Sequence, residues 1–225
     1  MHGLFLTEGK KAVSELLQSD FEIERIIAKD EDSNIPNIEV MDKADLASIS
    51  SFKSPSDVIA IARIKLALGQ PKVMGPIFLL DSIRDPGNVG TIIRTVRWFG
   101  ASDLIVSSDC ADVYNPKTIQ ASMGAVFHLR IHTTDLSESI ETLKSSGYRI
   151  FGTEMNGTPL NETELPADSA IIIGNEGQGI NQSILDLCDE QIAIEGGNIN
   201  GVESLNAAMS VGIIAHHLYL GSNGK

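Results

Sequence analysis

Polar and glycine-rich residues that could do chemistry gather in three loops. The loops span 81–88, 174–179 and 195–206, and each lies between an apolar run and a helical run. Open α/β proteins bind their ligands in the loops at the carboxyl ends of parallel strands. Three such loops in one part of the chain therefore predict a composite ligand site.

The first loop leads into a helix that carries an arginine. Pro86 and Gly87 predict a tight turn, and Asn88 is a candidate helix N-cap. Arg94 falls outside the apolar stripe that follows and can project toward the loop or toward solvent. Two interpretations stay open: a solvated arginine on a capped surface helix, or an arginine whose forked donors bind an anion. The stripe itself consists of Val89, Ile92, Ile93, Val96 and Phe99.

The second loop holds three glycines within six residues, which lets a ligand approach the backbone closely. No lysine follows Gly179, so the loop is not the phosphate-binding loop of nucleotide hydrolases. It also lacks the G-x-G-x-x-G pattern with an acidic ribose anchor, which disfavours a dinucleotide-dependent oxidoreductase. Glu176 is either a solvated side chain or a partner of a neighbouring backbone amide.

The third loop precedes a long apolar helix. Ser204 is a candidate N-cap, and the helix continues to Leu220. Asn206 is expected one turn into this helix, where it needs hydrogen-bond partners if it is buried. A helix that is apolar on more than one face is buried on more than one side, so we expect it to serve the core and a subunit interface.

Composition restricts the class of protein. The chain has 225 residues and a net charge of −13. Its 42% of hydrophobic and 21% of charged residues are typical of a soluble globular protein. The acidic total argues against a large basic surface for nucleic acid, although Arg84, Arg94 and Arg97 leave room for a local patch. No signal peptide or membrane span is recognisable, so a cytoplasmic protein is expected. Cys110 and Cys188 fit neither a disulfide framework nor a zinc pattern, and we expect partly buried thiols.

Strands and helices alternate from Gly75 onward, which predicts a mostly parallel, doubly wound α/β sheet. The expected strands are 77–80, 103–107, 127–132, 148–153, 170–173 and 191–194. The expected helices are 88–99, 115–122, 136–145, 180–187 and 203–220.

The N-terminal third is expected to form a small α/β unit of its own. Its helices are predicted at 9–17 and 43–49, and its strands at 23–28, 38–41 and 57–64. Glycine and proline then punctuate a boundary. The predicted organisation is an N-terminal domain at 1–68, a linker at 69–75 and a second domain at 76–225.

In their order and spacing, the three loops resemble the motifs of the SpoU/TrmH family of RNA ribose 2′-O-methyltransferases, in the SPOUT superfamily. The first motif has Asn88, Gly90 and Arg94 at the family's spacing. The second, Gly-Asn-Glu-Gly-x-Gly, stands at 174–179 without a mismatch, and the third, Ser-Leu-Asn, at 204–206. The resemblance covers residues 76–220 and extends loosely to an N-terminal module similar to ribosomal-protein-like RNA-binding domains.

This resemblance implies a trefoil-knotted α/β domain that forms a homodimer and binds S-adenosylmethionine in the knot. It places the cofactor against Gly174, Ile194 and Leu205. Asn175 and Thr153 are also expected to bind the cofactor. It implies no metal and no membrane. The implied partner is a structured rRNA or tRNA, whose ribose 2′-hydroxyl receives the methyl group.

By the same resemblance Arg94 is the catalytic arginine. Its motif neighbours, counted with it as catalytic, are Asn88, Glu176, Ser204 and Asn206. Methyl transfer from a sulfonium needs in-line placement of the hydroxyl and help with its proton. Arginine stays protonated in proteins, so binding the RNA phosphate and polarising the hydroxyl is the role expected of this side chain.

The sequence departs from the family pattern before the third motif. The strand ends Ile194-Glu195-Gly196, where the family usually has Ile-Pro-Met, and Glu195 adds a negative charge there. This departure and the acidic total favour one rival, a non-catalytic RNA-binding or assembly protein that keeps the knotted fold. The intact motif residues favour the enzyme.

Overall fold

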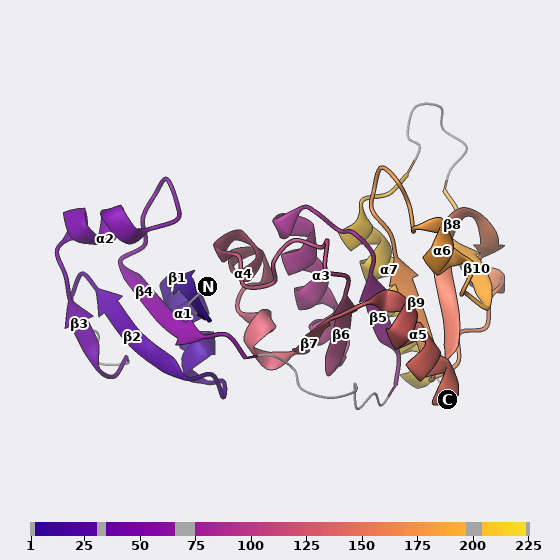
Figure 1. The fold of residues 1–225 in the computed structure, drawn as a ribbon, viewed down its shortest axis with the longest axis horizontal. Helices are drawn as coiled ribbons and strands as arrows, with labels where there is room; N and C mark the ends of the chain where they lie inside the picture. The colour runs from indigo at the N-terminus through magenta and orange to yellow at the C-terminus, as the bar shows by residue number, and fades with distance from the viewer. Residues whose placement is uncertain (1–2, 31–34, 66–74, 197–203, 224–225) are drawn as a thin grey trace.

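The computed structural model describes residues 3–30, 35–65, 75–196 and 204–223, which form two β-sheets with their helices (Figure 1). The four-stranded sheet has the order β1-β4-β2-β3, and the six-stranded sheet has the order β10-β8-β9-β5-β6-β7. Of the linker predicted at 69–75, only Gly75 lies within the described residues. None of the helices in these residues has the length and apolar character that a membrane span requires.

The four-stranded sheet is built from the N-terminal residues. Its elements are β1 (Leu4–Glu8), α1 (Lys10–Leu17), β2 (Ile23–Ala28), β3 (Ile38–Val40), α2 (Lys43–Ile49) and β4 (Val58–Arg63). Sequence analysis missed β1, which pairs antiparallel with β4 from Leu4↔Arg63 to Glu8↔Ile59. A five-residue strand leaves little periodicity to detect, and its partner lies more than fifty residues away in sequence.

All neighbouring strands of the six-stranded sheet are parallel, as the alternation predicted. Its strands are β5 (Ile77–Leu80), β6 (Asp103–Val106), β7 (Arg130–Thr133), β8 (Arg149–Pro159), β9 (Ser169–Ile173) and β10 (Glu190–Ala193). Its α-helices are α3 (Pro86–Trp98), α4 (Pro116–Ser122), α5 (Leu136–Ser145), α6 (Gln182–Leu185) and α7 (Ala207–Asn223), with short 3₁₀ turns η1 (Ala125–His128) and η2 (Leu160–Glu162).

The strand predicted at 127–132 was wrong in its first half. Residues 125–128 form η1, and β7 starts only at Arg130. Gly124 precedes this turn with φ 86°, a left-handed conformation that glycine adopts without strain. The apolar run Ala125-Val126-Phe127 therefore packs into the core from a turn, because a short apolar run does not distinguish a strand from a turn.

Helices cover both faces of the six-stranded sheet, because successive side chains of its strands point to opposite faces. Phe78 and Leu80 of β5 pack in one apolar cluster with α3 and α7. Ile77 and Leu79 pack on the other face with α5 and α6. Both faces are thus buried, as is usual for parallel sheets.

The sheet reverses its winding between β5 and β9. From β5 the chain moves to β6 and β7 on one side, whereas β8 and β10 lie beyond β9 on the other. The two strands pair directly, with Leu80 opposite Ile173. Because α3 and α6 leave these strands on opposite faces, their loops meet at the position where open α/β sheets bind ligands.

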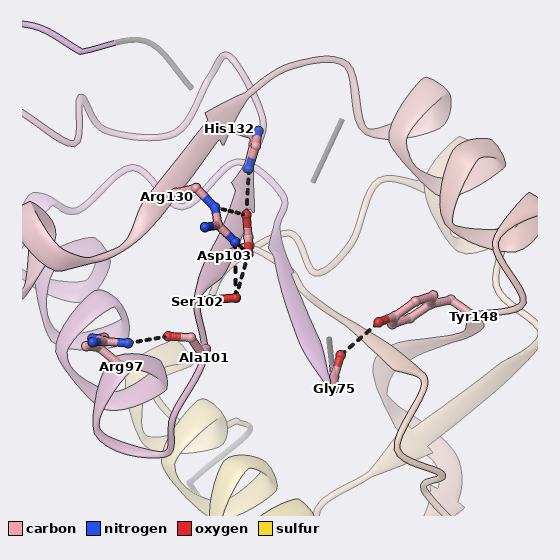
Figure 2. Close-up of polar contacts among 8 residues, drawn as sticks. All are labelled: Gly75, Arg97, Ala101, Ser102, Asp103, Arg130, His132 and Tyr148. Atoms are coloured by element: carbon pink, nitrogen blue, oxygen red, sulfur yellow. Dashed lines mark hydrogen bonds and ion pairs between the residues drawn. The ribbon is translucent and has the colours of Figure 1, made fainter. Parts of the chain in front are cut away.

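The opposite, amino-terminal edge of the sheet carries a buried ionic cluster (Figure 2). The Asp103 carboxylate, only 2% exposed, accepts hydrogen bonds from Arg130 Nη2 at 2.6 Å and Ser102 Oγ at 2.6 Å, and it lies 2.9 Å from His132 Nε2. Burial raises the pKa of Asp103, but the bonds from Arg130, Ser102 and His132 outweigh it and hold that pKa below its usual range. The cluster joins β6 to β7.

The two sheets are joined by aromatic side chains. Phe5 of β1 stacks on Tyr114 with ring centroids 4.9 Å apart and on Phe127 at 5.8 Å. Tyr114 Oη donates to Lys65 O at 3.0 Å, and His128 Nε2 lies 2.9 Å from Glu15 Oε2. Figure 1 accordingly shows α1 and β1 next to α4.

Helix α7 starts at Ala207, four residues later than predicted, and in the single chain it is buried on one side. Val211, Ile214 and Leu218 lie in the core, whereas Met209 is 62% exposed and Ile213 40% exposed. Burial of one side by the core is thus as expected, and burial of the other side at a subunit interface stays a prediction.

Candidate active site

Hydrogen bonds join the first two loops across the β5–β9 pair. Asp81, at the end of β5, accepts from Asn181 N at 2.6 Å, and Asn175 Nδ2 donates to Ser82 O at 2.9 Å. Asp81 is 4% exposed, and Ser82 Oγ also donates to it at 3.1 Å. Sequence analysis did not assign Asp81 to the site, although a carboxylate at the end of an apolar strand is a signal for one.

The second loop folds back on itself. Asn175 N donates to Gly179 O at 3.0 Å, and Gly179 N donates to Asn175 O at 2.8 Å. Asn175 Oδ1 also accepts from Gly177 N and Gln178 N at 2.9 and 3.2 Å. A Cβ on Gly174 would collide with the backbone of Gly179 and Ile180. Gly174 is therefore required by the closure of the loop itself, whatever ligand it meets.

Asn88 is not an N-cap, contrary to the sequence-based expectation. The cap of α3 is Asp85, whose Oδ1 accepts from Asn88 N at 2.8 Å, and Pro86 and Gly87 form the first turn. Both aspartate and asparagine are good caps, so the run Asp-Pro-Gly-Asn fits either start. The side chain of Asn88 is thereby free to face the other loops.

A second cap was also assigned to the wrong residue. Helix α7 is capped by Asn206, whose Oδ1 accepts from Ala208 N at 3.0 Å and from Met209 N at 3.3 Å. Ser204 is exposed and makes no such bond, and Asn206 precedes the helix and is exposed. The expectation of an asparagine one turn inside the helix is therefore wrong.

The structure brings three predicted site residues together. Asn88 Nδ2 donates to Glu176 Oε1, and Asn206 Nδ2 donates to Asn88 Oδ1 at 3.0 Å. Asn88, in the first turn of α3, is 88 residues from Glu176 and 118 residues from Asn206 in sequence. The composite site inferred from the three loops is thus connected by side-chain hydrogen bonds.

Arg94 lies on the exposed surface of α3, six residues after Asn88. The apolar stripe behind it, Val89, Ile92, Ile93 and Val96, is buried as predicted. In the described part of the chain, Arg94 makes no hydrogen bond or ion pair. A guanidinium held on a rigid helix with its donors unused is available to an anionic ligand.

The residues expected at the cofactor are arranged around the same loops. Leu205, next to Asn206, is 46% exposed, and Ile194, directly after β10, is half-buried. Thr153 Oγ1 donates to Ile172 O at 2.9 Å and so ties β8 to β9. An exposed leucine beside polar loops offers an apolar contact to a ligand.

Neither cysteine is suited to nucleophilic chemistry. Burial raises the pKa of the Cys110 thiol, and burial raises that of Cys188 to about 11. Both thiols are free and partly buried, as predicted. Within the described residues, no cluster of three or more histidine, cysteine or acidic side chains is arranged to hold a metal ion.

Comparison with known proteins identifies the family. A model of the SpoU rRNA methylase family matches residues 75–216, which include all three loops. The chain belongs to the SpoU rRNA methylase family. A relative from Bacillus subtilis, the 23S rRNA (guanosine(2553)-2′-O)-methyltransferase RlmP, is 29% identical over 224 residues, covering 95% of this chain and 88% of that protein.

Solved structures share the fold. A TrmH-family protein of Porphyromonas gingivalis superposes with a TM-score of 0.84 at 28% identity, over 96% of this chain and 89% of that one. The SpoU methyltransferase AviRb of Streptomyces viridochromogenes, in complex with AdoMet, gives a TM-score of 0.85 at 24% identity, over the same shares. The α/β fold expected from the SpoU motifs is thus confirmed, whereas the knot stays a prediction.

Proposed function

We propose that this protein transfers the methyl group of S-adenosylmethionine to a ribose 2′-hydroxyl of rRNA or tRNA. The observation that carries the proposal is the convergence of the three SpoU motif loops, joined by Asn88, Glu176 and Asn206. Helix α3, which holds Asn88, also carries Arg94, and Arg94 has no hydrogen bond or ion pair within the described residues. Ribosomal RNA is the first substrate to test, because the relative that matches 95% of this chain is named as a 23S rRNA methyltransferase.

The residues of the site fit a cationic nucleoside cofactor. The described loops hold the exposed apolar side chain of Leu205 next to Asn206, which is linked through Asn88 to the carboxylate of Glu176. A sulfonium is favoured by nearby carboxylates, whereas the phosphates of a nucleotide would be repelled. When bound, S-adenosylmethionine supplies the activated methyl group.

Each motif residue has a role that its position supports. Gly174, Asn175, Ile194 and Leu205 would hold the cofactor through backbone and apolar contacts, and Thr153 would fix the strand beneath it. Arg94 would bind the RNA phosphate and polarise the 2′-hydroxyl. Ser204, exposed beside Leu205, is available to the ribose.

The N-terminal unit, 1–68, is proposed to orient the RNA. Phe5 of β1 stacks on Tyr114 and Phe127 of the methyltransferase domain, and Glu15 of α1 pairs with His128. These contacts hold α1 and β1 beside α4, which itself packs on α3. RNA bound to this unit would therefore have a defined direction toward Arg94.

We also propose a homodimer formed through α7. Exposed apolar side chains recur on this helix at helical spacing, at Met209, Ile213 and Leu220, and Trp98 at the end of α3 is 83% exposed. Soluble monomers rarely expose contiguous apolar surface of this kind. A second copy of the chain would bury it, with the same face of each subunit in contact.

The variant Arg94→Ala tests the catalytic assignment. Removing a group that stabilises developing charge lowers kcat by about 10²–10³-fold. Because Arg94 is exposed and unpaired in the described chain, Tm and the affinity for S-adenosylmethionine should stay close to wild type. Arg97→Ala, on the same helix, is the control. It removes the hydrogen bond from Arg97 Nη1 to Ala101 O at 3.2 Å and should keep activity within about twofold, since surface substitutions have small effects. Wild-type turnover in Arg94→Ala would contradict the role, and a wild-type protein that binds RNA without methylating it would favour the non-catalytic alternative.

A further inference from the structure

A directed chain of hydrogen bonds runs from the amino end of α7 to Glu176. The backbone N–H groups of α7 donate to Asn206 Oδ1, and Asn206 Nδ2 donates to Asn88 Oδ1 at 3.0 Å. Asn88 Nδ2 then donates to Glu176 Oε1. We call these three side chains the relay; it connects the third motif to the second through the first.

The helix end determines the direction of every bond in the relay. A backbone N–H can only donate, so the atom of Asn206 that faces α7 must be its oxygen. Its nitrogen then faces Asn88, which must present oxygen, and the nitrogen of Asn88 must meet an acceptor. A carboxylate is such an acceptor, and flipping either amide would set like groups against each other.

The relay leaves one carboxylate oxygen available. Glu176 Oε1 is held by Asn88, whereas Oε2 has no partner in the described part of the chain. A carboxylate fixed at one oxygen can present the other in a defined direction, which is what positioning in a reactive site requires. Charge-assisted bonds of this kind are also stronger than neutral ones.

We propose that Asn88 and Asn206 are positioning residues that aim Glu176 Oε2 at a hydroxyl or amine donor of the bound cofactor or RNA ribose. This inference rests on the proposed methyltransferase function and refines it. It takes Asn88 and Asn206 out of contact with the substrate and gives Glu176 the contact instead. Helix α7, whose other face is proposed to form the dimer, thereby sets the geometry of the site.

One substitution distinguishes the role of Asn206 in the relay from its role as the cap of α7. Asn206→Asp keeps an oxygen for the α7 N–H groups, and aspartate caps as well as asparagine does, but the variant cannot donate to Asn88. Asn115→Asp is the matched control. Asn115 caps α4 by accepting from Lys117 N at 2.9 Å, and its amide nitrogen has no partner in the described residues.

A reciprocal pair of substitutions tests whether Asn88 donates the hydrogen bond and Glu176 accepts it. Asn88→Asp places a carboxylate against Glu176, where like charges repel. In the double variant Asn88→Asp/Glu176→Gln, the new amide donates to the new carboxylate and still presents its oxygen to the ligand. In Glu176→Gln alone, the amide nitrogen is turned toward the ligand instead.

The experiment measures kcat with RNA and S-adenosylmethionine, and Tm, for all five variants. We expect Asn206→Asp, Asn88→Asp and Glu176→Gln to lower kcat by about 10- to 100-fold, the loss expected for a hydrogen bond to a charged group. Tm of Asn206→Asp should fall by no more than about 4 °C because the cap is kept. The double variant should recover both kcat and Tm relative to Asn88→Asp, and Asn115→Asp should match wild type.

Two outcomes would overturn the relay: wild-type kcat in Asn206→Asp, or a double variant with no better kcat and Tm than Asn88→Asp. If wild type itself transfers no methyl group, the proposed function fails, and recovery of Tm in the double variant still decides the relay. Calorimetry on the same variants identifies the donor. Weaker binding of S-adenosylmethionine assigns it to the cofactor, and unchanged binding with lower kcat assigns it to the RNA ribose.

Discussion

Replacing Gly90 by alanine tests how the first motif is built. Gly90 follows Asn88 by two residues and lies where α3 packs on α4. A Cβ at this position would stand 2.6 Å from Ala121 Cβ, 2.9 Å from Ser122 N and closer still to Thr118 O. Two of these three neighbours are backbone atoms, so α4 would have to move away from α3.

Two opposing effects determine the magnitude. Alanine in place of glycine inside a helix normally stabilises by about 1 kcal/mol. Overpacking a close contact costs about 1–3 kcal/mol, and the upper end applies here because backbone must shift. The net destabilisation is about 2 kcal/mol, which lowers Tm by roughly 4–8 °C in a chain of this size. Methyl transfer should fall as well, because α3 carries Asn88 and Arg94.

Calorimetric or spectroscopic melting provides the assay, and Gly212→Ala on α7 provides the control. A Cβ at Gly212 meets nothing within 4 Å in the single chain, so this substitution should not lower Tm through packing inside the subunit, and helix propensity alone would raise Tm by about 2–4 °C. Tm of Gly90→Ala at or above the wild-type value would refute the packing argument.

Two further predictions concern the ionic cluster and α7. The pKa of Asp103 is held low by Arg130, Ser102 and His132 against the effect of burial, so the stability it contributes is present above the unfolded-state value near pH 3.9 and is lost as pH falls further. Asp103→Asn should therefore lower Tm at pH 7, and its gap to wild type should shrink toward pH 3; a gap independent of pH would contradict this. Ile213→Asp, on the exposed apolar face of α7, should convert a dimer to monomers in light scattering at micromolar concentration, and a wild-type monomer would contradict the proposed interface.

Local periodicity predicted the parts of the fold that depend on neighbouring residues. The buried stripe Val89–Val96, the exposed position of Arg94 and the parallel six-stranded sheet all follow from spacing within single elements. Strand β1 could not be predicted in this way, because it pairs with β4, which lies more than fifty residues away in sequence.

The sequence predicted candidate site residues, whose roles stay predictions, but it did not predict the hydrogen bonds between them. The resemblance to the SpoU motifs singled out Asn88, Glu176 and Asn206, but the hydrogen bonds between them span 88 and 118 residues. Both wrongly assigned caps came from runs that hold two good capping residues, Asp85 with Asn88 and Ser204 with Asn206. The packing of the backbone determines which of the two residues caps the helix.

The most direct test of the central claim is the product of the reaction. Purified protein is incubated with rRNA or tRNA lacking its modifications and with methyl-labelled S-adenosylmethionine, and the RNA is digested to nucleosides for mass spectrometry. We predict label in a nucleoside methylated on the ribose 2′-oxygen, lost in Arg94→Ala and kept in Arg97→Ala. Label on a base, or none in either RNA, would contradict it.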